Sequence, residues 1–279
     1  MVDDIERAHL VDPTDRSFRI GRWGPAADLT DLIRRFWVPV WSVPPGDAAP
    51  QRVLQYPVCL MVVTPTYARF YGVRRGVSEN VLSGNGWAVG TMLSPAAGSL
   101  VVGGSVAAWT DRHAELAEIF GSVGAELAAA VRATMLPAPS ADDRQHAATG
   151  LFEDWLRAHL PVDADGHLVN EIVSYVESNS DVTEVAQICA GFGIGERTLQ
   201  RLTHRRLGLT PKWLIQRRRL QEASERLRDP GVTVARIAAD LGYSDEAHMV
   251  RDFRTVTGET PGRFAARFGG DQVASPRSG

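Results

Sequence analysis

Cysteine is scarce in this sequence, which has only Cys59 and Cys189 among 279 residues. Two cysteines so far apart exclude a disulfide framework and any metal cluster held by four thiolates. Such sparing use of cysteine is typical of a reducing compartment. We therefore expect a cytoplasmic protein in which both thiols are buried as small apolar groups.

Ligand and catalytic patterns are also missing. None of the seven histidines forms a His-x-His pair or stands near a carboxylate at ligand spacing, so we predict no metal site and no cofactor. The glycine motifs of serine hydrolases, nucleotide triphosphatases and dinucleotide-binding enzymes do not occur. Without a residue on which to base a reaction, the sequence predicts a protein that is not an enzyme and has no catalytic residue.

Hydrophobic targeting segments are absent as well. The first ten residues carry Asp3, Asp4 and Glu6 and no apolar run, so we expect no secretory signal peptide. Segment 80–110 has no charged residue and is long enough to cross a bilayer. Its six glycines, however, are typical of turns and short strands and would make a poor membrane helix. We expect no membrane span.

Charge is distributed unevenly, although the formal net value is only -3. Residues 1–166 carry 14 arginines against 19 acidic residues, whereas 167–269 carry 15 basic residues against 13 acidic ones. The imbalance is largest in 195–219, where eight basic residues accompany Glu196 alone. Because a solvated helix face usually mixes both signs, this segment indicates a polyanionic partner.

The first zone, residues 1 to about 115, is expected to form a small sheet or barrel. Aromatic and β-branched runs separated by glycine, proline and asparagine predict strands at 36–43, 58–64, 68–73 and 86–92. Residues 122–160 change to a helical composition, and such helices commonly cover a barrel or pair two subunits. We therefore expect a β-rich regulatory domain over 1–160, for effector binding or dimerisation.

The rest of the chain is predicted to be helical. Residues 161–166 form the expected linker, 167–269 an all-α domain and 270–279 a disordered tail. Within the helical domain, Thr210 and Pro211 begin a long helix, with the threonine as N-cap and the proline at the first helical position. The predicted fold class is α+β.

One pattern of the helical region occurs twice. Segments 185–190 and 234–239 read VAQICA and VARIAA, and each is followed by a glycine, Gly193 or Gly242, and by a second helix. A short helix, a glycine turn and a second helix form the helix-turn-helix layout, whose second helix enters the DNA major groove. Any helical hairpin can mimic one such pattern, whereas a tandem pair with a basic second helix is specific. The sequence predicts two helix-turn-helix units.

Seven short motifs follow one another in this region: GERTLQRL at 195–202, GLTP at 208–211, RRRL at 217–220, LRDP at 227–230, VARIA at 234–238, GYSD at 242–245 and GETP at 258–261. In this order they resemble the DNA-binding domain of AraC/XylS-type bacterial transcription regulators, over about 85 residues. The N-terminal zone resembles the companion domain of some members, through Arg35-Phe36-Trp37 and the QRVL motif at 51–54.

The resemblance implies a sequence-specific transcription regulator. Its implied partners are double-stranded DNA, RNA polymerase, a small-molecule effector and a second copy of the chain. The sequence departs from the family pattern at Gly195, where serine usually caps the first recognition helix, and at Thr203 and Met249, where large aromatic residues are common. We expect softer packing beneath both recognition helices.

Two recognition helices at the ends of a connecting helix of about 26 Å would read adjacent major grooves about one DNA turn apart. The residues predicted to face the bases are Arg197, Gln200 and Arg201 in the first helix, and Glu246, Ala247, His248 and Arg251 in the second. Those predicted to bind phosphates are Arg205, Arg206 and Lys212. Two alternatives stay open: Glu246 accepts from cytosine or is merely solvated, and His248 reads a base or packs between helices.

Five aromatic residues alternate on the strands of the N-terminal zone: Trp37, Trp41, Tyr56, Tyr71 and Trp87. Such a set is expected either to line an effector pocket or to form a plain aromatic core. A DNA-repair alkyl transferase, which some relatives carry beside this domain, is excluded because it needs a cluster of cysteines. An interaction protein that binds no DNA remains an alternative, and only DNA binding would depend steeply on salt.

Overall fold

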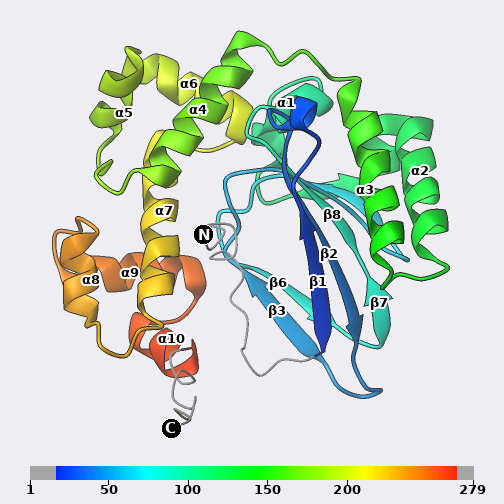
Figure 1. Cartoon of the computed structure of the whole chain (residues 1–279). Helices are drawn as coiled ribbons and strands as arrows, with labels where there is room; N and C mark the ends of the chain where they lie inside the picture. Colours follow the sequence, from blue (N-terminus) through cyan, green and yellow to red (C-terminus); the bar gives the residue numbers. More distant parts are fainter. Residues whose placement is uncertain (1–16, 269–279) are drawn as a thin grey trace, which may run out of the picture.

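The computed structural model describes residues 17–268 (Figure 1). The expectations for the first ten residues and for a disordered tail at 270–279 fall outside the described residues. An antiparallel sheet with two covering helices forms one side of the molecule, and a region made only of helices forms the other (Figure 1). This arrangement is the predicted α+β fold, with the sheet first and the helical region second.

The main sheet has seven strands in the order β1-β2-β8-β4-β5-β9, with β7 paired to the far end of β2. Its strands are β1 (Phe18–Trp23), β2 (Ile33–Ser42), β4 (Leu60–Val63), β5 (Ala68–Tyr71), β7 (Asn85–Trp87), β8 (Val89–Leu93) and β9 (His113–Glu115). A second, two-stranded ribbon consists of β3 (Ala49–Val53) and β6 (Ser78–Leu82). The four predicted strand segments are all present, whereas β1, β3, β6 and β9 were not predicted. Most of these four are short or polar and lack the apolar runs from which strands are predicted.

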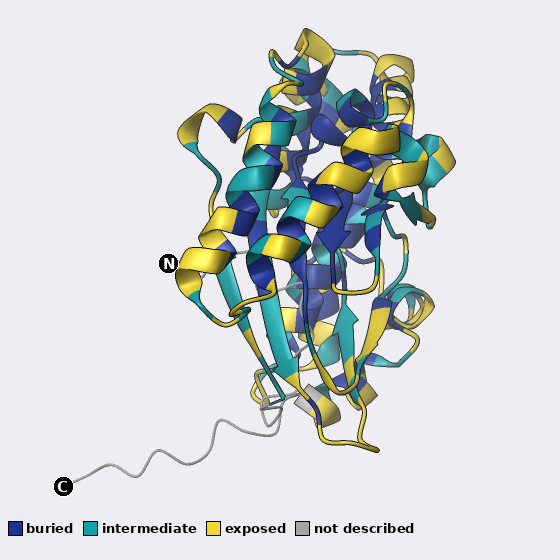
Figure 2. Cartoon of the chain, turned by 90° about the vertical axis from the view of Figure 1, so that its right-hand side faces the viewer, coloured by how far each residue is buried: buried dark blue, intermediate teal, exposed yellow. Residues whose placement is uncertain are grey.

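The two faces of the main sheet pack against different partners. Along β2, Phe36 and Val38 point into a core that is closed by α2 (Leu116–Met135) and α3 (Asp142–Arg157). Trp37 and Trp41 alternate with them and point to the opposite face. Figure 2 shows that the outer sides of the covering helices are exposed and that their inner sides are buried. The predicted helices at 122–160 therefore cover a sheet.

The uncharged segment 80–110 is divided among several short elements. It contains the end of β6, then β7 and β8, the short helix α1 (Ala97–Val101) and the 3-10 helix η3 (Val106–Trp109). Another 3-10 helix, η2 (Ala27–Leu29), lies between β1 and β2. Among residues 17–268, no helix has both the length and the hydropathy needed to span a bilayer.

Seven helices make up the helical region: α4 (Ala164–Ser178), α5 (Val185–Phe192), α6 (Glu196–Leu207), α7 (Pro211–Arg226), α8 (Val234–Asp240), α9 (Glu246–Thr257) and α10 (Pro261–Phe268). The Thr210 side chain accepts a hydrogen bond from Trp213 N, so the predicted N-cap of α7 is confirmed. Helix α4 begins inside the expected linker 161–166, because the Asp163 side chain accepts from Gly166 N and caps it. The extended part of the linker is therefore only three residues long.

The helical region contains the two predicted helix-turn-helix units, α5–α6 and α8–α9, joined by α7. Gly193 and Gly242 have φ values of 63° and 72°, in the left-handed region that favours glycine. Thr203 lies on the buried side of α6 and Met249 on the buried side of α9, and both side chains are fully buried. The expected softer packing stays a prediction at both positions.

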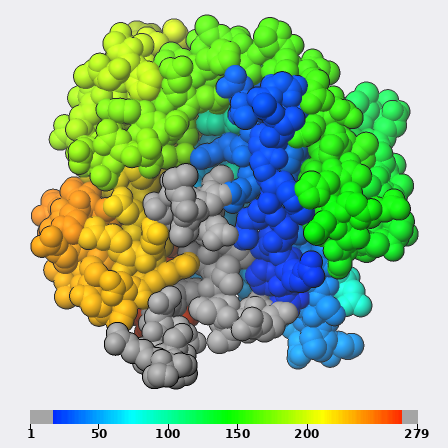
Figure 3. Space-filling model, in the orientation of Figure 1, coloured from blue at the N-terminus to red at the C-terminus, as the bar shows by residue number. Residues whose placement is uncertain are grey.

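The two units differ in what they pack against. The first shares one continuous hydrophobic core with the sheet, through residues such as Val106, Leu207 and Leu209. The second has a core of its own around Met249 and Phe253. Helix α4 crosses the top of the molecule and touches the loop of η2, as the continuous surface there shows (Figure 3). The first unit thus shares its core with the sheet region, whereas the second has a separate core and is joined to the first by α7.

Candidate nucleic-acid interface

The first recognition helix, α6, presents a basic outer face. Arg197, Gln200 and Arg201 are all exposed, whereas Leu199 and Leu202 are buried beneath them. This is the arrangement expected from their spacing, since residues three and four apart share one side of a helix. These three side chains can therefore reach a groove without any rearrangement of the helix.

The amide of Gln200 is oriented by a neighbour on the same helix. Its Nε2 donates to Glu196 Oε1 at 2.9 Å. That bond uses one amide hydrogen of Gln200 and leaves the second amide hydrogen and the carbonyl oxygen for other partners. A donor beside an acceptor is the pair that suits adenine N7 and N6.

The second recognition helix, α9, begins at a strong cap. The Asp245 carboxylate accepts from His248 N at 2.6 Å, and this backbone hydrogen bond lowers the pKa of Asp245, so the cap is charged at neutral pH. Glu246, Ala247 and Arg251 are exposed along the helix that follows. Counted from the caps, Ala247 and Arg251 hold the same positions in α9 as Arg197 and Arg201 in α6, and Glu246 matches Glu196.

His248 is held by three neighbours. Its Nδ1 lies 3.1 Å from Ser244 Oγ, its Nε2 lies 3.9 Å from a carboxylate oxygen of Asp252, and its ring meets the edge of Tyr243 at a centroid distance of 5.2 Å. The side chain is half-buried. These contacts favour the packing role for His248 over base reading.

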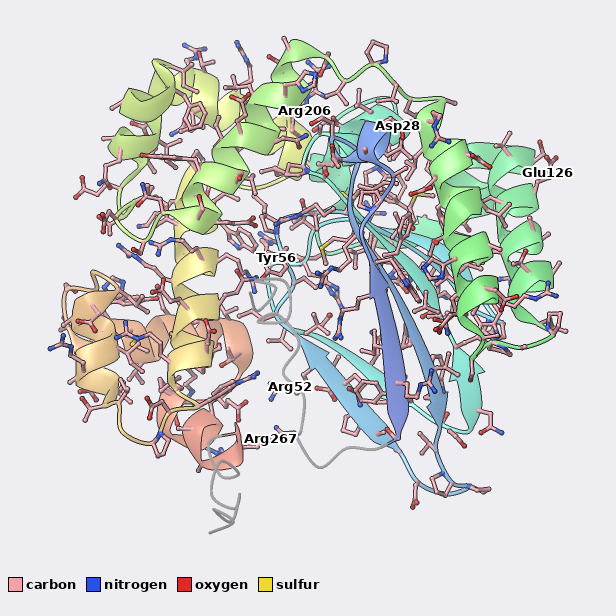
Figure 4. The ribbon with its side chains drawn as sticks, in the orientation of Figure 1. Asp28, Arg52, Tyr56, Glu126, Arg206 and Arg267 are labelled. Carbon is pink, nitrogen blue, oxygen red and sulfur yellow. The ribbon has the colours of Figure 1, made fainter. Side chains whose placement is uncertain are left out.

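Arg206 is a correction to the predicted phosphate contacts. Only 3% of its side chain is exposed, and its guanidinium donates to Ser99 Oγ at 2.9 Å and to the Asp163 carboxylate. Helical spacing explains the difference, because position 206 lies four residues after Leu202 on the buried side of α6. In this structure Arg206 fastens the recognition helix to the sheet domain and is not available to a phosphate (Figure 4).

The partner carboxylate of Arg206 stays charged. Burial by itself raises the pKa of Asp163, but hydrogen bonds from Arg206 and from Gly166 N bring the pKa below its ordinary value. The pair is therefore an ion pair at neutral pH. It joins α6, the cap of α4 and, through Ser99, helix α1.

Two further arginines of the basic segment also point inward. Arg217 donates to the carbonyl oxygens of Arg74 and Arg75, and Arg218 donates to Val182 O at 3.0 Å. Burial lowers the pKa of Arg217 to about 9, so it remains a cation at neutral pH. The net positive charge counted from the sequence of 195–219 is therefore larger than the charge that this segment exposes on the surface. The exposed cations of this segment are Arg197, Arg201, Arg205 and Lys212.

The burial of Arg206 leads to the expectation that Arg206→Ala destabilises the protein without changing phosphate binding. The substitution removes the donor to Ser99 Oγ and to one oxygen of Asp163, whose other oxygen keeps its bond from Gly166 N, and we expect a cost of about 1–3 kcal/mol in the free energy of unfolding. Urea denaturation measures this loss. The salt dependence of DNA binding should stay as in the original chain, whereas a slope lower by about one unit would restore Arg206 to the phosphate contacts.

The five predicted effector residues do not share one site. Tyr56 is buried and Trp37, Trp41 and Tyr71 are half-buried in a cluster on the face of the sheet opposite α2 and α3. Trp87 is the correction, because it lies in the core on the other face. It pairs across the strands with Val40, and cross-strand partners point to the same side of a sheet. We call the four remaining residues the aromatic cluster.

Glycines allow the two tryptophans of the aromatic cluster to lie flat on the sheet. A Cβ atom at Gly90 would stand 2.2 Å from the Trp37 ring, and one at Gly86 would stand 2.3 Å from the Trp41 ring. The indole of Trp41 is also fixed by a hydrogen bond from Nε1 to Ser83 O at 3.3 Å. Together the two rings form a flat apolar surface that remains partly open to solvent.

A separate cavity of about 170 Å³ lies between the sheet and the helical region. Tyr56 is the member of the aromatic cluster that lines it. The other lining residues are polar or charged: Arg34, Ser174, Glu177, Ser178, Arg218, Gln221 and Glu222. Arg34 and Glu177 form a bidentate ion pair across it, with distances of 3.0 and 2.7 Å. The cavity is thus chemically unlike the aromatic cluster.

The two thiols have different surroundings. Cys59 is buried, and burial raises the pKa of its thiol to about 12, so it stays protonated and unreactive. Cys189 is only half-buried, which differs from the expectation that both are enclosed. Within residues 17–268 there is no group of three or more histidine, cysteine, aspartate or glutamate side chains able to hold a metal ion.

Two family models match the chain. Residues 188–267 match a model described as a helix-turn-helix domain. Residues 22–115 match a domain of unknown function, DUF6597. The first match begins within α5 and ends one residue before the end of α10, and the second covers most of the sheet.

Similar proteins of known name match mainly the helical region. A crystal structure described as a probable AraC family transcriptional regulator from Rhodopseudomonas palustris CGA009 is 30% identical, with 36% of this chain and 96% of that one covered and a TM-score of 0.34. NimR of Escherichia coli, an HTH-type transcriptional regulator, is 29% identical over 43% of this chain and 42% of its own length. RhaS of Pectobacterium carotovorum, an HTH-type transcriptional activator, is 29% identical over 33% of this chain. The chain spans only 34% of RhaS, so these two similarities concern part of each relative.

Proposed function

Because this chain belongs to the AraC/XylS family of transcription regulators, we propose that it binds duplex DNA with α6 and α9 in adjacent major grooves. The observation that carries the proposal is the exposed basic face of α6, together with the equivalent exposed positions at the start of α9. The proposed base-facing residues are Arg197, Gln200, Arg201, Glu246, Ala247 and Arg251, and the proposed phosphate contacts are Arg205 and Lys212. We further propose that the protein regulates a promoter in the cytoplasm, together with RNA polymerase.

The experiment is selection of duplexes with a randomised centre by the full-length chain, followed by binding measurements over a range of salt. Each phosphate contact contributes about 0.9 to the slope of log affinity against log salt. With Arg205 and Lys212 as the proposed phosphate contacts, we expect a slope of at least about 2. A slope near zero, or no enriched sequence, would overturn DNA binding and favour an interaction protein.

We also propose that the sheet domain, about residues 1–160, regulates the helical domain by binding a small apolar effector at the aromatic cluster. The support is that Trp37 and Trp41 lie flat and partly open to solvent, where a plain core would bury them. Two copies of the chain are proposed to pair through α2, because Val123 in this helix and Leu136 directly after it are large apolar residues that are 50% and 71% exposed.

The aromatic cluster gives a prediction that separates sensing from stability. Trp41→Ala is expected to change the response of DNA binding to an effector while leaving the affinity without effector nearly intact. Trp87→Ala is the matched control, and it should instead lower the melting temperature because Trp87 is 5% exposed in the core. Thermal melts and binding curves of both variants, across a set of small aromatic and aliphatic compounds, measure these two effects. If both variants lose stability equally, Trp41 is a core residue.

A further inference from the structure

The two recognition helices are held at the same end by the sheet domain. Each helix stops at a left-handed glycine, Gly208 after α6 and Gly258 after α9, with φ values of 69° and 79°. Thr110 Oγ1 donates to Gly208 O at 3.1 Å, and Arg52 Nη2 donates to Thr257 O at 2.6 Å. Both donors come from the sheet domain and satisfy carbonyl groups that a helix end leaves unpaired. The opposite ends of both helices carry the proposed base-facing residues and are free of such contacts in the described part of the chain.

The contact at the end of α9 is the stronger of the two. Arg52 also forms an ion pair with Glu259, with 2.8 Å between Nη1 and Oε1. The side chains are only 16% and 13% exposed, so solvent screens the pair weakly. A cation at the C-terminal end of a helix also interacts favourably with the helix dipole. Figure 4 shows Arg52 between the β3–β6 ribbon and the last helices of the chain.

Neighbours of Arg52 complete the core of the second unit. Leu54 is fully buried among the residues of that core, although it belongs to the sheet domain. Its carbonyl oxygen accepts from Gln221 Nε2 at 3.3 Å, and Val77 N donates to Val256 O at 3.3 Å. The sheet domain therefore supplies both polar and apolar contacts to the second unit.

The same segment also reaches the aromatic cluster. Arg52 and Leu54 face the second unit, whereas Val53, which lies between them, packs on the cluster. Alternate residues of an extended chain point to opposite sides, so one short segment touches both. Tyr56, a member of the cluster, follows two residues after Leu54. A shift of this segment would change the position of Arg52 relative to α9.

The first unit is fixed differently. It shares its core with the sheet and is fastened by Arg206, whereas the second unit depends on α7 and on segment 52–54. We propose that Arg52, with Leu54, is a positioning element that sets the second recognition helix relative to the first and thereby selects the spacing between the two halves of the DNA site. Arg52 touches no base or phosphate in this role. The inference rests on the proposed function, since it concerns the same two helices.

The test uses the full-length chain and the two-part duplex that it selects from the randomised library. Arg52→Ala is expected to weaken binding to this duplex about tenfold, with lost protection over the half read by α9 and unchanged protection over the half read by α6. It should also bind duplexes with one or two inserted base pairs between the halves almost as well as the original. Arg52→Lys keeps the positive charge at the helix end, so it should lose less affinity, less protection and less spacing preference than Arg52→Ala.

Arg157→Ala is the control for the loss of ion pairs elsewhere in the chain. It breaks the pairs with Asp28, at 2.8 Å, and with Asp154, at 2.9 Å, which are more exposed and lie within the sheet domain. This variant should bind as the original does. Glu259→Gln, which removes the same ion pair with little change in size, supplies the test if Arg52→Ala does not fold. Unchanged affinity and spacing preference, or equal loss over both halves, would overturn the inference while leaving DNA binding established. Failure of the original chain to select any duplex would instead overturn the proposed function.

Discussion

Phe253→Ala is expected to remove the second helix-turn-helix unit from the DNA complex while the first unit still binds. Phe253 is fully buried at the centre of the second core, and its ring meets the edge of the Phe264 ring at a centroid distance of 5.3 Å. Replacing a buried phenylalanine with alanine costs about 3–5 kcal/mol. Because the second core is separate from the core under the sheet, the loss should stay local.

Protection of the two-part duplex at single-base resolution measures this effect, since the half read by α9 should lose its protection. Leu199→Ala is the matched variant in the first unit, where Leu199 is fully buried in the core shared with the sheet. Leu199→Ala is expected to cost about 2–5 kcal/mol in the free energy of unfolding, and it should lower the stability of the sheet domain as well. If both variants unfolded the whole chain in one transition, the two units would form a single cooperative structure.

Arg201→Ala is expected to reduce affinity for the selected duplex far more than affinity for random DNA. Arg201 lies on the exposed side of α6, where arginine can donate two hydrogen bonds to guanine O6 and N7. Losing such a contact costs about 1–3 kcal/mol, and only where the guanine is present.

Arg205→Ala is the internal control, because Arg205 is exposed on the same helix and is proposed to bind a phosphate. It should weaken both DNAs by similar factors and lower the salt slope by about one unit. Titrations of both variants on both DNAs, at several salt concentrations, separate the two roles. Equal losses on both DNAs for Arg201→Ala would make Arg201 a phosphate contact.

Features that depend on neighbours in the chain could be predicted from the sequence. The cap at Thr210 and the turns at Gly193 and Gly242 follow from local chemistry, and the structure has them as expected. The burial of Arg206 is also predictable from the sequence, because Arg206 shares one side of the helix with Leu199 and Leu202. Its positive charge indicates a phosphate contact, but the helical period places the side chain on the buried side.

Features that depend on docking could not be predicted. The sequence suggested one strand over 86–92, but the structure has two, β7 and β8, with a break at Ala88. The pairing of Trp87 with Val40 then fixes the face on which this ring lies. The contact of Arg52 with Glu259 joins residues 207 positions apart, and no local pattern indicates it. Such contacts appear only when the sheet and the helical region are placed side by side.

Methylation interference on the selected duplex tests the central claim most directly. Methylation at guanine N7 blocks the major groove, which is where α6 and α9 are proposed to lie. We predict two clusters of interfering guanines, about 10 base pairs apart from centre to centre and on one face of the duplex. A single cluster, two clusters on opposite faces, or no interference at any guanine would contradict the account.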